Sequence, residues 1–426
     1  MNTLSPLALV SLITVLIAML SLAVISRLYS RSWLEPGSFF LLVWVLYIFI
    51  PVLVAPENRI YPFGIWYIFS FSLAVLLGSL VWNKLEPVSR LDKALTTGAR
   101  LDRYNNTLFN FTMIFVLLSA IGVAVLLVAG IKRYNLVTDL YSLSSLPNLF
   151  YVDRDTGIFQ LPWQIKGFLY FTYTASLICG FTFKLFHGKK KLFCLLPLLI
   201  AFLNGVILAV RSGIILTIML WLSGWFGSKV YLQDFKFRPQ TVMFSLVSFM
   251  ILIIIFISVR WLRGGADDPF LLMVFLDNVR ISYFGHLSAF STWLNDYHYV
   301  ALTFGTSTFS GPLDFLGIIE REIGFYKENI FLANSVYTNI FTVFRGLIED
   351  FSIPGTLIIG FGIGALARLS FNKCSYGQYM WVIPLTLYYA FVLYSPIISL
   401  FNYNSAIMAW VITAIPLLLI RKKLIL

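Results

Sequence analysis

Charged residues are scarce in this sequence. They make up 12% of its 426 residues, whereas about 25% is usual in a soluble domain. Apolar residues make up 59%, and runs of about 20 of them, enough to cross the hydrocarbon core of a bilayer, recur along the chain. The shortage of charge therefore excludes an ordinary soluble domain and predicts a multi-pass membrane protein.

Regular alternation of apolar and polar residues is also lacking in these runs, which argues against the strands of a membrane β-barrel. Backbone groups within lipid must be satisfied internally, and helices remain as the spanning elements. We predict an all-α fold with about eleven transmembrane helices in one integral membrane domain, residues 1–426. The expected spans are 6–26, 37–54, 65–82, 107–129, 167–186, 192–210, 212–227, 241–259, 352–370, 379–395 and 405–420.

Cysteine and histidine are rare, with three of each. No cysteine belongs to a Cys-x-x-Cys or histidine-containing pattern, so the spacing predicts neither a disulfide framework nor a metal site. Asp153-Arg154-Asp155 does match the D-x-D pattern that binds a metal and a nucleotide diphosphate in many sugar transferases. The pattern precedes Thr156-Gly157, which predicts a turn, and the segment is expected to face outward, where nucleotide sugars are absent, so we expect no metal there. We expect no cofactor.

Basic residues outnumber acidic ones, 31 to 19, and give a net charge of +12. Most of them lie in short loops between the expected spans, which the positive-inside bias explains without a nucleic acid partner. These loops are expected to be cytoplasmic, so that the N-terminus lies outside and the C-terminus inside. The first apolar run ends in no small-residue cleavage site and is expected to be retained. The cytoplasmic loops include Arg27, Arg31, Lys84, Arg90, Lys93, Lys189, Lys190, Lys191, Arg368 and Lys373.

Two long loops, 130–166 and 260–351, are expected to face outward. Within the second, residues 269–295 are mostly apolar but include Asp277, Arg280 and His286, which a central span would tolerate poorly. We predict an amphipathic helix at the membrane interface there, and a second helix over 333–350 that ends before Pro354-Gly355. A polar stripe on that second helix, facing a cavity, would contain Asn334, Thr338, Phe341, Thr342, Arg345 and Glu349.

Arginines collect on the expected outer side. The planar guanidinium group stays charged at low dielectric and matches phosphate oxygens, so we expect these residues to bind a lipid diphosphate near the headgroup level. Snorkelling toward lipid phosphates is the alternative explanation. The candidates are Arg211, which lies between two apolar runs, Arg260, Arg263, Arg280 and Arg345.

A carboxylate or a histidine near these arginines could serve as a general base. Asp350, Glu349 and His286 are the candidate catalytic residues, together with Arg345. We expect Asp350 to activate an acceptor hydroxyl or to orient the arginine, and Glu349, four residues after Arg345, to form a structural ion pair. The alternatives are that Asp350 caps a helix end and that His286 has an ordinary interfacial role.

A short signature lies at the end of the second long loop. The string Asn334-Ser335-Val336-Tyr337-Thr338, then Arg345, Glu349-Asp350-Phe351 and Gly355, resembles the N-x-Y-T…D-F-G-x-x-G signature of the Wzy-type oligosaccharide repeat-unit polymerases. These polymerases act in O-antigen and capsule assembly. Ser352 stands where the signature has a glycine. The general plan, many spans with two outward loops that contain arginines, is also similar.

This resemblance implies a GT-C-like, metal-independent glycosyltransferase of the bacterial inner membrane. It would transfer the growing undecaprenyl-diphosphate-linked glycan to the non-reducing end of an incoming lipid-linked repeat unit, and Asn334 and Tyr337 would position sugar. Membrane lipids, a flippase and a chain-length regulator are the implied partners. An O-antigen ligase, a lipid-linked oligosaccharide flippase and a non-catalytic scaffold remain as alternatives.

Overall fold

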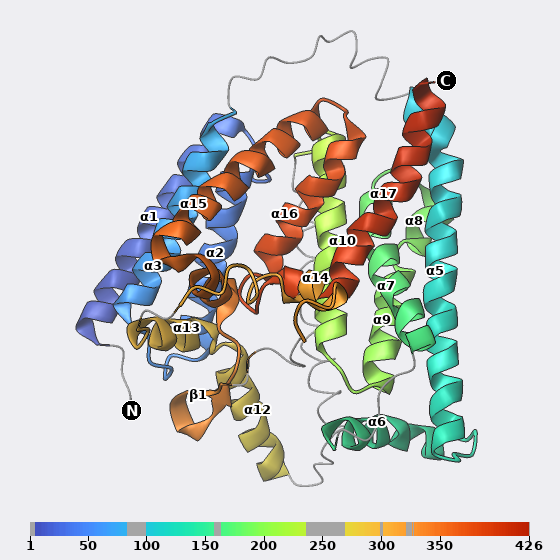
Figure 1. The fold of residues 1–426 in the computed structure, drawn as a ribbon, viewed down its shortest axis with the longest axis horizontal. Helices are drawn as coiled ribbons and strands as arrows, with labels where there is room; N and C mark the ends of the chain where they lie inside the picture. Colours follow the sequence, from blue (N-terminus) through green and yellow to red (C-terminus); the bar gives the residue numbers. More distant parts are fainter. Residues whose placement is uncertain are drawn as a thin grey trace. The chain divides into compact units, whose positions relative to one another are not determined.

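The computed structural model describes residues 5–82, 99–156, 163–235, 269–298, 301–320, 326 and 328–425, which are almost wholly helical (Figure 1). The chain divides into two compact units. Unit 1 comprises Met1–Val88 and Met273–Asn404, and unit 2 comprises Ser89–Leu272 and Ser405–Leu426.

Seven helices in the described part of the chain are long and apolar enough to cross a membrane. They indicate a multi-pass membrane protein, as the sequence predicts. Shorter apolar helices occupy the last two predicted spans, and α7 (Trp163–Thr182) occupies the predicted span 167–186. The predicted span 241–259 lies outside the described residues, so the number eleven stays a prediction. The seven helices are Pro6–Ser30, Pro36–Val54, Pro62–Leu80, Asn105–Arg133, Gly188–Ile207, Ser212–Tyr231 and Thr342–Ser375.

Unit 1 begins with three consecutive helices that each start at a proline. Proline fits the first turn of a helix because its φ is already helical and its missing N–H would have no partner there. The helices are α1 (Pro6–Ser30), α2 (Pro36–Val54) and α3 (Pro62–Leu80). The rest of the unit is α12 (Pro269–Tyr283, in the unit from Met273), α13 (His286–Asn295), α14 (Ser310–Phe315), β1 (Ile330–Phe331), β2 (Tyr337–Thr338), α15 (Thr342–Ser375) and α16 (Val382–Tyr394), with short 3-10 turns at Ala333–Ser335, Tyr379–Trp381 and Leu400–Asn402.

Helices α3 and α15 cross at backbone contact. A Cβ on Gly78 would lie 1.9 Å from the carbonyl oxygen of Phe361, and a Cβ on Gly364 would lie 2.0 Å from that of Val75. Membrane helices commonly approach this closely through small residues, because lipid gives them no hydrophobic drive to associate. The crossing fixes α15 against the N-terminal helices.

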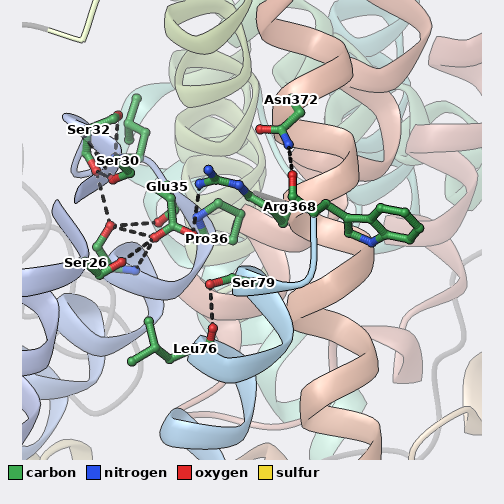
Figure 2. A network of polar contacts seen from close by, with 12 residues as sticks. Ser26, Ser30, Ser32, Glu35, Pro36, Leu76, Ser79, Arg368 and Asn372 are labelled. Carbon is green, nitrogen blue, oxygen red and sulfur yellow. Dashed lines mark hydrogen bonds and ion pairs between the residues drawn. The ribbon is translucent and has the colours of Figure 1, made fainter. Parts of the chain in front are cut away.

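A buried polar network closes the α1–α2 turn (Figure 2). Glu35 is buried, and its Oε2 accepts from Ser26 Oγ and from the backbone N–H of Ser38, each at 2.8 Å. Its Oε1 lies 3.4 Å from the Nη1 of Arg368, which reaches it from α15. Nearby, Asn372 Nδ2 donates to the carbonyl oxygen of Trp82 at 2.9 Å. The network ties the C-terminal part of α15 to the α1–α2 turn and to the end of α3.

The α2–α3 turn is held by α12 and α13. Asn58 Nδ2 donates to the carbonyl oxygen of Ile281 at 3.2 Å, and the backbone N–H of Tyr61 donates to Ser291 Oγ at 3.1 Å. Because α2 joins this turn to the Glu35 turn, the two sets of contacts lie at opposite ends of unit 1. The predicted outward segment therefore packs at the end of α2 that is opposite to the basic α1–α2 loop.

The predicted helix over 333–350 is wrong in its first half. Asn334 and Ser335 have φ of 54° and 60°, a left-handed conformation that Asn tolerates better than most residues. They turn the chain so that β1 and β2 pair antiparallel, with Ile330 opposite Thr338. Helix α15 begins only at Thr342. The polar stripe therefore does not form, because Asn334 and Thr338 lie outside the helix.

The end predicted before Pro354-Gly355 agrees with a break in α15, whereas the single helix over 269–295 differs from the structure. Two helical parts of α15 meet at a kink at Ser352, with φ 67° and ψ 170°. This is a region of backbone space that is essentially reserved for glycine. The 269–295 segment is broken between α12 and α13 at Gly285, where a Cβ would lie 2.3 Å from Leu332 Cδ1. A larger residue at Gly285 would displace the side chain of Leu332.

Unit 2 is a helical bundle in which α7 and α10 cross closely. A Cβ on Gly180 would lie 2.0 Å from the carbonyl oxygen of Trp221, and one on Gly224 would lie 2.3 Å from that of Leu177. The predicted outward loop 130–166 contains a helix, α6. The elements are α5 (Ala99–Arg133), α6 (Leu140–Asp155), α7, α8 (Gly188–Phe193), α9 (Leu196–Ile207), α10 (Ser212–Tyr231) and α17 (Asn404–Ile425, in the unit from Ser405).

Candidate functional site

Arg345, in the first turn of α15, is the centre of a charged cluster in unit 1. Its side chain is only 7% exposed. Nε donates to Glu349 Oε1 at 2.8 Å, which confirms the predicted ion pair one helical turn apart, and Nη2 donates to Glu328 Oε2 at 2.7 Å. The site thus holds one formal positive charge against two negative ones.

Aromatic rings surround the Arg345 guanidinium. Its Cζ lies 4.2 Å from the ring centroid of Tyr326, 4.3 Å from that of Phe341 and 5.3 Å from that of Trp293. Such cation–π contacts strengthen when the cation is removed from water. Burial also raises the pKa of the Tyr326 phenol, so the ring remains neutral. The rings fix the plane of the guanidinium and keep water from it.

One donor of this guanidinium, Nη1, is buried and has no hydrogen-bond partner among the residues that the structure describes. A buried donor without a partner costs free energy, of the order of 1–3 kcal/mol, which a bound ligand, ion or water molecule offsets by supplying the acceptor. The geometry therefore suits a ligand with anionic oxygens, bound at Nη1 and one neighbouring nitrogen.

Asp350 has a different setting. It is fully buried, and its Oδ1 accepts from the Thr303 hydroxyl and, at 3.0 Å, from the backbone N–H of Ser307. Its Oδ2 accepts from the backbone N–H of Thr308 at 2.6 Å. The carboxylate thus fastens the loop before α14 to α15. Glu349 thus contacts the arginine as expected, whereas Asp350 anchors a loop.

Arg280 forms a second cluster, in α12. It pairs with Asp277, at 2.6 Å, and with Glu57, and it donates to the carbonyl oxygen of Val54. The hydrogen bond from Arg280 lowers the pKa of the Glu57 carboxyl, so the pair stays charged. Asn334 Nδ2 donates to Asp277 Oδ2 at 3.4 Å. Two of the predicted binding residues, Arg280 and Asn334, therefore lie in one cluster. In this cluster the carboxylates of Asp277 and Glu57 already pair with the arginine.

His286 and Tyr337 lie in opposite environments. The His286 ring is buried, with Nε2 3.1 Å from the carbonyl oxygen of Tyr47, and burial lowers the pKa of the imidazole to about 4. This placement favours a structural contact between α13 and α2 over proton transfer to a substrate. Tyr337 is exposed beside Phe331 on the β-hairpin, where both rings are accessible to a sugar.

The remaining predicted arginines are placed elsewhere. Arg211 belongs to unit 2, where it precedes the first residue of α10. Arg260 and Arg263 lie outside the described residues. In the D-x-D segment, Asp153 is paired with Arg133 at 2.8 Å and accepts from Tyr134. In the part of the chain that the structure describes, no group of three or more His, Cys, Asp and Glu side chains could hold a metal ion.

Several site residues were not found from the sequence. Glu328, Tyr326 and Trp293 reach Arg345 from outside α15, and no helical or strand periodicity links these positions to it. Glu57, in the α2–α3 turn, was likewise missed as the partner of Arg280. The one available signal was the presence of acids and aromatic rings in the same long loop as the arginines.

Comparison of the chain with protein-family models, curated proteins and solved structures gives no match.

Proposed function

We propose that this chain is an oligosaccharide repeat-unit polymerase of the Wzy type, a glycosyltransferase that needs no metal ion. It acts in the bacterial inner membrane, with its N-terminus and the 260–351 segment outside and its C-terminus inside. Its substrates are undecaprenyl-diphosphate-linked oligosaccharides, and a flippase and a chain-length regulator work with it. The bond broken joins the growing glycan to the lipid diphosphate, and the acceptor is the non-reducing end of a new repeat unit.

The Arg345 site carries the proposal. Glycosyl transfer from a lipid diphosphate leaves negative charge on the departing phosphate, and a fixed guanidinium with a free donor stabilises that charge without reorganising. Arg345 is held by Glu349 and by three rings, and its Nη1 is buried without a partner in the described residues. The diphosphate-binding roles of Arg211, Arg260 and Arg263 and the catalytic role of His286 stay predictions.

The backbone conformation at Ser352 also supports the resemblance to the polymerase signature. The polymerase signature has glycine directly after Asp-Phe, and here Ser352 follows Asp350-Phe351. Its φ of 67° and ψ of 170° are values that glycine adopts without strain. The backbone at this position thus favours the residue type that the signature contains, although the sequence has serine.

The test compares two arginine variants in a strain that lacks this gene. Arg345→Lys keeps the charge but loses the planar pair of donors. Arg59→Lys is the matched control, because Arg59 also stacks on a ring, Tyr61 at 4.6 Å, but is exposed. We expect lipopolysaccharide with a single repeat unit from Arg345→Lys and a full ladder from Arg59→Lys, at equal protein levels. A deletion strain with core lipopolysaccharide alone would indicate a ligase or a flippase, and a full ladder in that strain would refute the proposal.

A further inference from the structure

The two carboxylates on Arg345 differ in their attachment to the fold. Glu349 lies on the same helix as the arginine, and its side chain is 22% exposed. Glu328 lies in the segment before β1, and its side chain is 71% exposed. Each glutamate has one carboxylate oxygen within 2.8 Å of a guanidinium nitrogen. The two contacts are therefore about equally short, although only Glu349 is held in place by the helix that contains the arginine.

The charge balance at Arg345 means that one of these carboxylates opposes the binding of an anionic ligand. A diphosphate approaching the site would meet one cation that two anions already neutralise. Glu328 can leave at little cost, because water solvates an exposed carboxylate once it separates from its partner. Its departure frees Nη2. Together with Nη1, which has no partner in the described part of the chain, Nη2 then presents two adjacent donors, the fork that binds phosphate oxygens bidentately.

We propose that Glu328 is a displaceable carboxylate, which occupies Arg345 until the diphosphate of a lipid-linked substrate replaces it. This inference rests on the proposed function for its substrate class. While the site is empty, Glu328 satisfies a buried cation that would otherwise lack one of its partners. When the substrate binds, its phosphate oxygens take over Nη2 and add Nη1, and Glu349 keeps the guanidinium in place through Nε. Glu328 therefore sets how tightly the site binds diphosphate.

The experiment measures binding of radiolabelled farnesyl diphosphate, a short lipid diphosphate, to the purified full-length protein in zwitterionic nanodiscs. We expect Glu328→Gln to bind about two- to fivefold more tightly than wild type, because a competing anion is removed. Glu320→Gln is the charge-matched control, since Glu320 is exposed and lies outside the cluster, and it should bind as wild type does. In an Arg345→Lys background, Glu328→Gln should give no gain.

The outcomes separate this inference from the proposed function. Binding that needs Arg345 but is unchanged or weaker in Glu328→Gln overturns the displacement, while the polymerase stands. If Glu328→Gln binds more tightly but deletion of the gene leaves the polysaccharide ladder intact, the displacement is supported and the protein acts in another reaction of a lipid diphosphate. Loss of the Glu328→Gln gain in nanodiscs of phosphatidylglycerol would instead assign the site to phospholipid headgroups and overturn the diphosphate proposal.

Discussion

The backbone N–H of Thr308 donates to Asp350 Oδ2 across 2.6 Å and joins the loop before α14 to the first part of α15. Asp350 lies five residues after Arg345 on the same helix, so the bond links the candidate site to a loop more than 40 positions earlier in the chain. This contact assigns the aspartate of the signature a role in holding the loop against the helix that contains Arg345.

Replacement of Asp350 by Asn should therefore act first on stability. One carboxylate oxygen becomes an NH₂ group, so one of the two backbone N–H groups that donate to Asp350, that of Ser307 or that of Thr308, loses its acceptor. A buried donor left without an acceptor costs about 1–3 kcal/mol. We expect a lower midpoint of thermal unfolding in detergent for Asp350→Asn, and a smaller change for Glu349→Gln. A normal midpoint with a single-repeat lipopolysaccharide would instead favour a catalytic Asp350.

Ser352→Gly should stabilise the protein. Serine at φ 67°, ψ 170° is strained, such strain costs about 1–3 kcal/mol, and glycine relieves it. Ser370→Gly, on an ordinary helical stretch of α15, is the control and should destabilise by about 1 kcal/mol. Thermal unfolding of both variants measures the difference. Equal loss of stability in both would show that the α15 backbone at 352 is not strained.

The Glu35–Arg368 pair should be coupled in stability. Both side chains are buried, and removal of one partner leaves an uncompensated buried charge, at a cost of about 3–5 kcal/mol. We expect Glu35→Gln and Arg368→Met each to lower the unfolding midpoint, and the double variant to lower it by less than the two single effects combined. Strictly additive effects would mean that the contact between Glu35 and Arg368 in Figure 2 contributes no pairwise energy.

The sequence was sufficient for elements governed by long apolar runs. Helices α1, α2 and α3 were predicted within a few residues at most ends, because lipid imposes their length and their apolar composition. The Asn334–Phe341 region was predicted as helix because its polar residues happened to recur at helical spacing. Two left-handed residues, Asn334 and Ser335, overrode that pattern. The site partners of Arg345 come from non-local contacts with Glu328 and Trp293, which no local periodicity encodes.

Burial lowers the pKa of His286 to about 4, whereas an unfolded chain has a histidine pKa of about 6.5. Below pH 6.5 the unfolded state therefore binds a proton that the folded state does not, and stability is lost progressively as the pH falls from about 6.5 to about 4, by about 3 kcal/mol in all. Above pH 6.5 both states are neutral and the residue has no effect.

His286→Gln removes this titration, so its unfolding midpoint should fall less steeply than that of wild type between pH 6.5 and pH 4.5. His298→Gln, at an exposed position, should keep the wild-type slope. Parallel curves for wild type and His286→Gln would contradict the burial of a neutral imidazole against Tyr47, and with it the structural role of His286.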